Sequence, residues 1–224
     1  MTDHPIDRRP LATRKLAVSQ RIARVIARTG ITPNQISLIG LFFGVGSGVA
    51  FAFTAHVSDP WWRVLFFAGA ALTQFRLACN MFDGMVAVEQ ASTSPVGELY
   101  NEIPDRISDS ATLIGLGYAL GGLPALGYAA ALLAMLTAYI RAMGKAAGGP
   151  QQFCGPMSKP QRMFTVTIAA AACAFLPTAW LPTVKIVEPL GLPGLALLLI
   201  CAGAAVASVR RLSRAAKSLR KGQV

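Results

Sequence analysis

Apolar residues occur along this chain in six long blocks, which are separated by shorter polar segments. A helix needs about 20 mostly apolar residues to cross a bilayer, and each block is long enough. The second and third blocks are the least apolar, because they share a window of acidic residues from 79 to 111. The pattern predicts six membrane-spanning helices, over residues 34–56, 61–88, 97–121, 124–147, 161–182 and 189–209.

The segments that flank these blocks are basic. Over residues 8–30, apolar residues alternate with arginines at helical spacing, which predicts an amphipathic helix lying in the membrane interface. The first 30 residues contain no apolar core followed by a cleavage site, so we expect no signal peptide. We therefore expect a cytoplasmic N-terminal segment with an interfacial helix (1–33), an all-α six-helix transmembrane domain (34–209) and a basic cytoplasmic tail (210–224).

Composition and charge support an integral membrane protein. The chain is 54% hydrophobic and 14% charged, whereas soluble domains carry roughly 25% charged residues. The net charge is +11, and the basic residues cluster before residue 34, between 141 and 162, and after 209. Six spans place these clusters on one side, which the positive-inside rule makes cytoplasmic. This predicts the inner membrane of a bacterium, with both termini cytoplasmic.

A basic protein can also bind nucleic acid. Here membrane topology and anionic lipid headgroups already account for the positive charge, so we expect membrane lipids as partners and no nucleic acid.

The window from 79 to 111 holds six of the ten acidic residues. Charged side chains inside membrane spans are costly and usually functional. Asn80 and Asp83 are three residues apart and share a helix face with Arg76. On the next helix the polar positions fall within an arc of roughly 100°. These positions are Glu98, Asn101, Glu102, Asp105 and Asp109.

Two facing rows of carboxylates repel each other, and a divalent cation is the usual remedy. Oxygen ligands favour Mg²⁺, Mn²⁺ or Ca²⁺ over zinc, and the two histidines, His4 and His56, lie far from this window. Such a cation pairs naturally with a phosphate or diphosphate ligand.

The same window resembles the signature of the CDP-alcohol phosphatidyltransferase family. The family pattern is Asp-x2-Asp-Gly-x2-Ala-Arg-x8-Gly-x3-Asp-x3-Asp. Every spacing is kept over 26 positions, and five of the eight fixed residues match. This chain reads Asn80-x2-Asp83-Gly84-x2-Ala87-Val88-x8-Gly97-x3-Asn101-x3-Asp105.

The resemblance implies a transferase that moves a phosphatidyl group from CDP-diacylglycerol, or another CDP-alcohol, to a small hydroxyl acceptor with release of CMP. It also implies Mg²⁺ or Mn²⁺ as cofactor, a homodimer, and a site open to the cytoplasm. Asp105 would act as the general base. The metal ligands would be Asp83, Asn80, Asn101 and Asp105. The nucleotide would lie against Gly84, Ala87, Gly97 and Arg76. The acceptor or its phosphate would contact Arg141, Lys159 and Arg162.

Three positions depart from the family pattern, namely Asn80, Asn101 and Val88. An amide oxygen can ligate a hard cation, but each asparagine removes one negative charge. Carboxylates in neighbouring rows could compensate, and Arg76 could supply the missing positive charge. These compensating carboxylates would be Glu98, Glu102 and Asp109.

Two alternatives stay open at this point. One is a family member that binds a nucleotide-lipid without turnover, and the other is a transporter that uses Asp83 and Asp105 as an ion or proton relay. The acceptor is also open among serine, glycerol phosphate, an inositol compound and another polyol.

Overall fold

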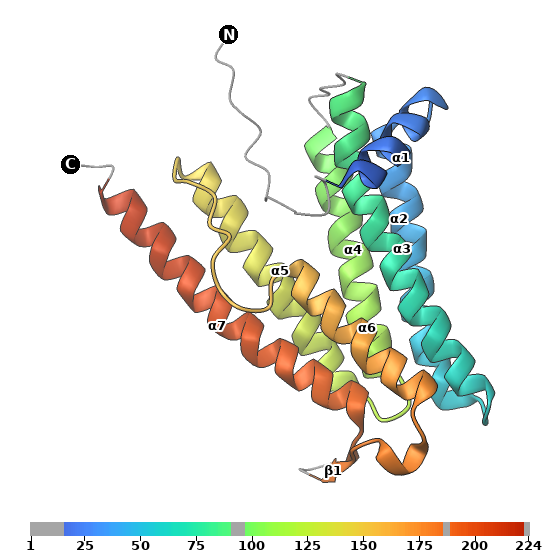
Figure 1. Ribbon diagram of the computed structural model, residues 1–224. Coiled ribbons are helices and arrows are strands. Elements are labelled where there is room, and N and C mark those ends of the chain that lie inside the picture. The colour runs from blue at the N-terminus through green and yellow to red at the C-terminus, as the bar shows by residue number, and fades with distance from the viewer. Residues whose placement is uncertain (1–15, 91–96, 186–188, 222–224) are drawn as a thin grey trace.

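The structure is a computed structural model that describes residues 16–90, 97–185 and 189–221 (Figure 1). At positions 97, 98, 101, 185 and 221 only the backbone is described. Two short 3₁₀ helices, η2 (Thr54–His56) and η3 (Thr178–Trp180), and a minimal hairpin of β1 (Val184–Lys185) and β2 (Pro189–Leu190) accompany the α-helices. The described α-helices are α1 (Ala17–Arg28), α2 (Pro33–Phe53), α3 (Trp61–Glu89), α4 (Gly97–Gly117), α5 (Pro124–Ala146), α6 (Lys159–Phe175) and α7 (Leu192–Lys221).

The predicted all-helical architecture is confirmed, and each predicted span corresponds to one of the helices α2 to α7. Within the described ranges, α2, α3, α5 and α7 are long and apolar enough to cross a membrane. Helix α4 carries four of the six acidic residues of the window, and α6 has only 17 residues. Helix α1 covers Ala17–Arg28, within the segment for which an amphipathic helix is predicted, while residues 1–15 lie outside the described part of the chain.

Two capping boxes fix where α2 and α6 begin. The Gln35 backbone N–H donates to Thr32 Oγ1 (3.3 Å), and the Thr32 N–H donates to Gln35 Oε1 (2.9 Å). Ser158 and Gln161 form the equivalent box before α6, with Pro160 in the first turn. These reciprocal bonds satisfy amide groups that a helix start leaves unpaired. Helix α6 therefore begins at Lys159, two residues before the predicted start.

Close packing of α2 against α4 depends on small residues. A Cβ on Gly44 would overlap Ser108, and a Cβ on Gly48 would overlap the carbonyl oxygen of Ala111. Gly115 faces Gly48 just as closely from the other side. These glycines let two helix backbones approach each other in the way small residues do in membranes.

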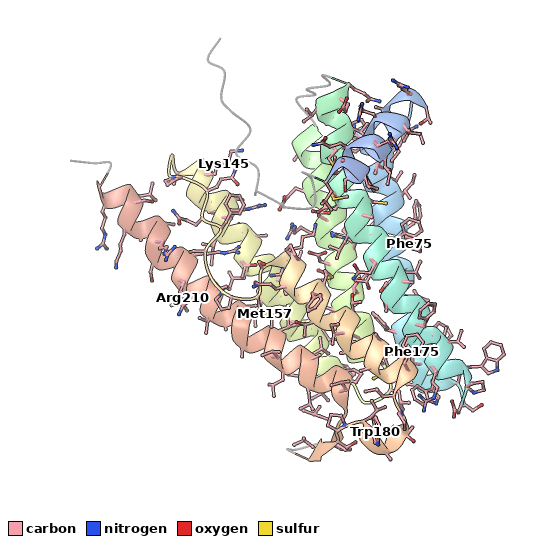
Figure 2. The ribbon with its side chains drawn as sticks, viewed as in Figure 1. Phe75, Lys145, Met157, Phe175, Trp180 and Arg210 are labelled. Atoms are coloured by element: carbon pink, nitrogen blue, oxygen red, sulfur yellow. The ribbon has the colours of Figure 1, made fainter. Side chains whose placement is uncertain are left out.

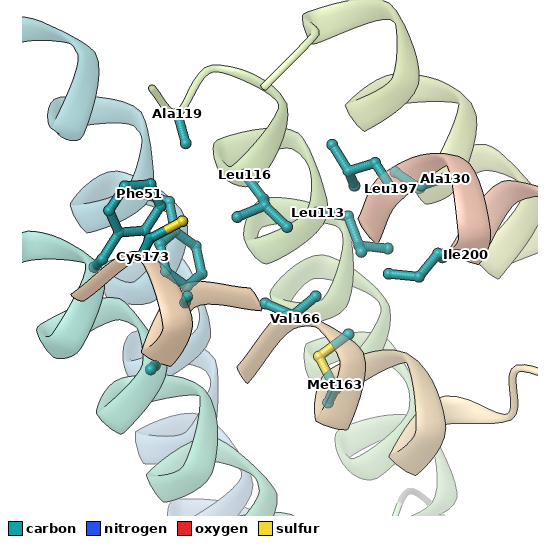
Figure 3. Close-up of a cluster of buried hydrophobic side chains, with 14 of the residues drawn as sticks. Phe51, Leu113, Leu116, Ala119, Ala130, Met163, Val166, Cys173, Leu197 and Ile200 are labelled. Carbon is teal, nitrogen blue, oxygen red and sulfur yellow. The ribbon is translucent and has the colours of Figure 1, made fainter. Parts of the chain in front are cut away.

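An apolar core fills the half of the bundle near the turns after α2 and α4 (Figure 3). Phe51 packs there with Phe66, and Leu113 and Leu116 of α4 join the two to the later helices. Helices α5, α6 and α7 contribute further residues to this core, including Ala130, Met163, Val166, Cys173, Leu197 and Ile200. Polar and charged side chains occupy the other half.

Helices α2 to α7 run in alternating directions, and α1 lies at the same end of the bundle as the C-terminal end of α7 (Figure 1). The segment 147–158 returns from that end of α5 toward the middle of the bundle, so that Met157 lies well below Lys145 (Figure 2). Arg211 of α7 holds this segment, because it donates to the carbonyl oxygens of Cys154 (3.0 Å) and Thr137 (2.9 Å). The first turn of α6 therefore lies inside the bundle.

Candidate functional site

Asp105 of α4 is the centre of the polar half. Arg76 Nη2 donates to its Oδ1 at 2.8 Å, and Asn80 Nδ2 donates to Oδ1 and Oδ2 at 3.0 and 3.1 Å. Lys159 Nζ donates to Oδ2 as well. Three donors from α3 and α6 thus converge on one carboxylate, and both of its oxygens are engaged.

Asn80 is bonded through both ends of its side-chain amide. While Nδ2 donates to Asp105, Oδ1 accepts from Lys159 Nζ at 3.0 Å. An aspartate at position 80 would have no N–H to offer, and two carboxylates at this distance would repel each other. The amide is therefore what allows Asn80 and Asp105 to bond directly.

Asp83 lies one turn further along α3 and is buried, with a relative exposure of 5%. Ser37 of α2 donates to its Oδ2 at 2.8 Å. A small cavity of about 10 Å³ opens between these two residues, Asn80 and Asp105. That volume is close to the minimum for one water molecule, so the cavity can hold one small guest.

A deeper ion pair joins Arg76 to Asp109, with Nη2 2.8 Å from Oδ1 and both side chains 2% exposed. Arg162 Nη2 lies 4.0 Å from the other oxygen of Asp109, and Arg162 Nη1 donates to the Met157 carbonyl at 2.9 Å. Arg76 Nε also donates to Ser108 Oγ at 2.9 Å. Asp109 therefore balances two buried guanidinium groups.

A third cluster lies nearer the surface. Arg141 Nη2 donates to both oxygens of Glu102 at 2.8 and 3.0 Å, and Arg106 Nη2 is 3.2 Å from the same carboxylate. The guanidinium of Arg141 also lies 5.7 Å from the centre of the Phe153 ring. These side chains are 19–39% exposed, so solvent reaches the cluster and the pairing is weak.

The structure thus brings Arg76, Asn80, Asp83, Asp105 and Lys159 into one site. The other predicted residues are placed in different surroundings: Glu102 and Asp109 pair with arginines, and Gly84 and Ala87 are half-buried further along α3. The side chains of Gly97, Glu98 and Asn101 lie outside the described part.

Sequence reasoning missed three residues that hold the site. Ser37 bonds Asp83, Ser108 bonds Arg76, and Arg211 holds the segment before α6. Ser108 follows Asp105 by three residues and could have been found from that spacing. Ser37 is one of two serines in the mostly apolar helix α2 and gives no such signal.

In the described site the cations are at least as numerous as the carboxylates, because Arg106 also lies 3.9 Å from Asp105. The carboxylates of Asp83, Asp105 and Asp109 face the cations of Arg76, Lys159 and Arg162. Among the residues whose placement is described, no three His, Cys, Asp or Glu side chains gather in a metal-binding group. Two carboxylates and the Asn80 amide surround the cavity, and this set of oxygen donors fits one hard divalent cation such as Mg²⁺ or Mn²⁺.

The chain is similar in sequence to several known proteins. The phosphatidylinositol phosphate synthase of Mycobacterium marinum is 29% identical over 175 residues, which cover 75% of this chain and 70% of that protein. The Mycolicibacterium smegmatis enzyme of the same name is 30% identical over 173 residues, covering 73% and 72%. An archaetidylinositol phosphate synthase of Pyrococcus horikoshii is 26% identical over 153 residues, covering 67% and 75%.

Solved structures share the fold. Phosphatidylinositol phosphate synthase of Mycobacterium tuberculosis, crystallised with manganese and citrate, superposes with a TM-score of 0.71 at 23% identity over 89% of this chain and 90% of that one. The same enzyme with CDP-DAG bound gives a TM-score of 0.71 at 22% identity, covering 89% and 94%.

A family model described as CDP-alcohol phosphatidyltransferase matches residues 30–208. The match includes α2 to α6, the part of α7 up to residue 208, and every residue around the cavity, while Arg211 lies just beyond it. This chain belongs to the CDP-alcohol phosphatidyltransferase family, whose members are membrane-embedded transferases of phospholipid biosynthesis.

Proposed function

We propose that this protein transfers a phosphatidyl group from CDP-diacylglycerol to a hydroxyl group of an inositol phosphate. The acceptor oxygen forms a new bond to the phosphorus next to the diacylglycerol, the bond to the CMP phosphate breaks, and the acceptor proton passes to a base. The observation that carries the proposal is the meeting of Asp83 and Asp105, at the family spacing, around one small cavity. The names of the relatives, which are phosphatidylinositol phosphate synthases, support the acceptor.

We also propose that α2 to α7 all cross the membrane and that both termini are cytoplasmic. The alternating helix directions support six spans (Figure 1). The basic residues of α1, of the segment 141–162 and of the end of α7 then share the cytoplasmic side. Helix α1 exposes Val18, Ile22 and Val25, which suits an interfacial helix. The proposal also includes a location in the bacterial inner membrane and assembly as a homodimer. It divides the chain into an N-terminal segment (1–33), a transmembrane domain (34–209) and a cytoplasmic tail (210–224).

Asp105 would receive the proton of the acceptor hydroxyl. Its Oδ2 is bonded to Lys159, so this role requires the Lys159 ammonium to leave that oxygen when substrates bind. A Mg²⁺ or Mn²⁺ ion held by Asp83, with Asn80 and Asp105, would neutralise the charge that develops on the departing CMP. Arg76 would keep Asp105 oriented through its bond to Oδ1.

Arg141 is the best placed cation to bind an acceptor phosphate, because it is 26% exposed while Arg162 is 3% exposed. Glu102 neutralises Arg141 in this structure. The acceptor phosphate would have to compete with that carboxylate. We expect Gly84, Ala87 and Gly97 to leave room for the cytidine, and the roles of Glu98 and Asn101 stay predictions.

The test is CMP release by purified protein supplied with CDP-diacylglycerol, Mn²⁺ or Mg²⁺, and one acceptor at a time: inositol phosphate, inositol, glycerol phosphate or serine. We expect release with inositol phosphate, and a loss of at least about 100-fold in Asp83→Ala and Asp105→Ala. Asp59→Ala is the matched control, since Asp59 is 63% exposed and distant from the site in sequence.

Each contrary result has a distinct meaning. CMP release by Asp105→Ala at the wild-type rate would refute the assigned base. Nucleotide binding without CMP release for any acceptor would indicate a family member that binds its substrate without catalysis. The hydrogen bonds that already occupy both oxygens of Asp105 would explain that result. Ion flux in liposomes without nucleotide binding would indicate a transporter.

A further inference from the structure

Lys159 occupies a position in this site that a metal ion would be expected to take. Its ammonium group contacts Asn80 Oδ1 at 3.0 Å and also Asp105 Oδ2. The two positions correspond to the first and last acidic residues of the family pattern, and both contacts use oxygen atoms. A positive charge is thus already present between two of the residues that would bind the cofactor.

The local charge balance shows why this matters. Among the described side chains, Asp105 and Asp109 pair with Arg76, Lys159 and Arg162. Arg106 lies 3.9 Å from Asp105, and Asp83 accepts from Ser37. A divalent cation that entered alone would add two positive charges to a mostly buried group that already holds at least as many cations as carboxylates. It would also meet the cations of Lys159 and Arg76 at short range, where water screens poorly. Metal binding by itself is therefore unfavourable here.

The diphosphate of a CDP-alcohol changes this balance, because each of its phosphates carries negative charge. It can compensate an incoming cation and also offer Lys159 a new partner. Lys159 can make this exchange since it is the first residue of α6 and its ammonium stands on a flexible four-carbon chain. Arg76, in contrast, is fixed by bonds to Ser108 and Asp105 and by its ion pair with Asp109.

We propose that Lys159 serves as a built-in cation between Asn80 and Asp105, so that a divalent metal binds this chain only together with a nucleoside diphosphate ligand. The inference rests on the proposed function for the identity of that ligand. Asn80 is essential to this arrangement, because its amide both donates to Asp105 and accepts from Lys159. An aspartate there would add the negative charge that permits a metal to bind alone.

The experiment measures Mn²⁺ binding by electron paramagnetic resonance in the detergent-solubilised full chain, with and without CDP as the soluble diphosphate. The signal of Mn²⁺ with CDP alone is subtracted. For the wild type we expect negligible binding of Mn²⁺ alone and at least about tenfold tighter binding when CDP is present. For Lys159→Met and Asn80→Asp we expect Mn²⁺ to bind without CDP, at least about tenfold more tightly than to the wild type.

Two control variants accompany these proteins. Lys217→Met removes an exposed lysine of α7 and should behave as the wild type. Lys159→Arg keeps the positive charge and should also exclude Mn²⁺ in the absence of CDP. Gel filtration shows whether Lys159→Met is folded, and Asn80→Asp provides an independent gain of metal binding if it is not.

Wild-type protein that binds Mn²⁺ without CDP as tightly as Lys159→Met and Asn80→Asp would overturn the inference. The result is independent of turnover. A wild type that releases no CMP but shows the expected Mn²⁺ pattern would refute the proposed reaction and leave the role of Lys159 standing. CMP release together with tight binding of Mn²⁺ in the absence of CDP would support the proposed reaction and refute the role of Lys159.

Discussion

Asp109 offers a direct way to separate the charges that hold the fold together from those that act on substrate. The perturbation is Asp109→Asn, which keeps the size of the side chain and removes its charge. Arg76 and Asp109 are both 2% exposed and lie 2.8 Å apart, and Arg162 approaches to 4.0 Å. The substitution leaves two buried guanidinium groups with less compensation.

Removing one partner of a buried ion pair costs about 3–5 kcal/mol of unfolding free energy, because the remaining charge stays out of water. One kcal/mol shifts the melting temperature of a chain of this size by about 2–4 °C. Together these values predict that Asp109→Asn melts roughly 6–20 °C below the wild type.

The assay is thermal unfolding in detergent, followed by intrinsic tryptophan fluorescence. Asp59→Asn is the matched control, because the Asp59–Arg63 pair (3.2 Å) has a 63% exposed carboxylate. An exposed pair contributes about 0–1 kcal/mol, so the control should melt within about 4 °C of the wild type. Asp109→Asn that melts within about 2 °C of the wild type would refute the reasoning. If that stable variant also lost CMP release, Asp109 would be acting on the metal or substrate, as a compensating carboxylate would.

Two further changes test the outer cluster and the helix contact. Glu102→Gln frees Arg141 and Arg106 from their shared carboxylate. In a CMP-release assay, the KM for a phosphorylated acceptor should therefore fall severalfold, while the rate with unphosphorylated inositol stays unchanged. An unaltered KM for both acceptors would contradict competition by Glu102. Gly48→Ala places a Cβ into the Ala111 carbonyl and should cost about 1–3 kcal/mol in thermal unfolding. Gly46→Ala, whose Cβ would lie 3.6 Å from Leu72, should be nearly neutral, and equal melting of the two variants would contradict the close packing.

The helices could be predicted well because membrane helices are long and apolar and because their starts carry local signals. Pro33 and Pro124 stand at the first turns of α2 and α5, where a missing amide hydrogen costs nothing. The predicted end of the fifth span at 182 was wrong by seven residues, since α6 stops at Phe175 shortly before Pro177. The helix of the sixth span, α7, begins at Leu192 instead of the predicted 189, because β2 (Pro189–Leu190) comes before it. The two-residue strands β1 and β2 leave no periodic pattern in the sequence.

The site was predictable along each helix but not between helices. Spacings of three and four residues placed Asn80 with Asp83, and Asp105 with Asp109, on common faces, and these rows do face each other. Which cation meets which carboxylate depends on distances across the bundle. Lys159 lies 79 residues from Asn80 in the sequence and reaches it only because the segment before α6 dips into the bundle. The spacing of residues along one helix does not predict how far this segment enters the bundle.

Asn80 and Lys159 depend on each other in this site. Carboxylates at positions 80 and 105 within hydrogen-bond distance would need a bound cation to remain together, because neither could donate to the other. With an amide at 80, the chain's own Asn80, Asp105 and Lys159 complete a bonded group that is stable without any ion. By the proposal above, a site bonded in this way would have little affinity for free metal but would keep the carboxylate of Asp83 beside a small cavity. The same substitution that weakens the family pattern therefore leaves room for metal chemistry, on the condition that the substrate brings the missing negative charge.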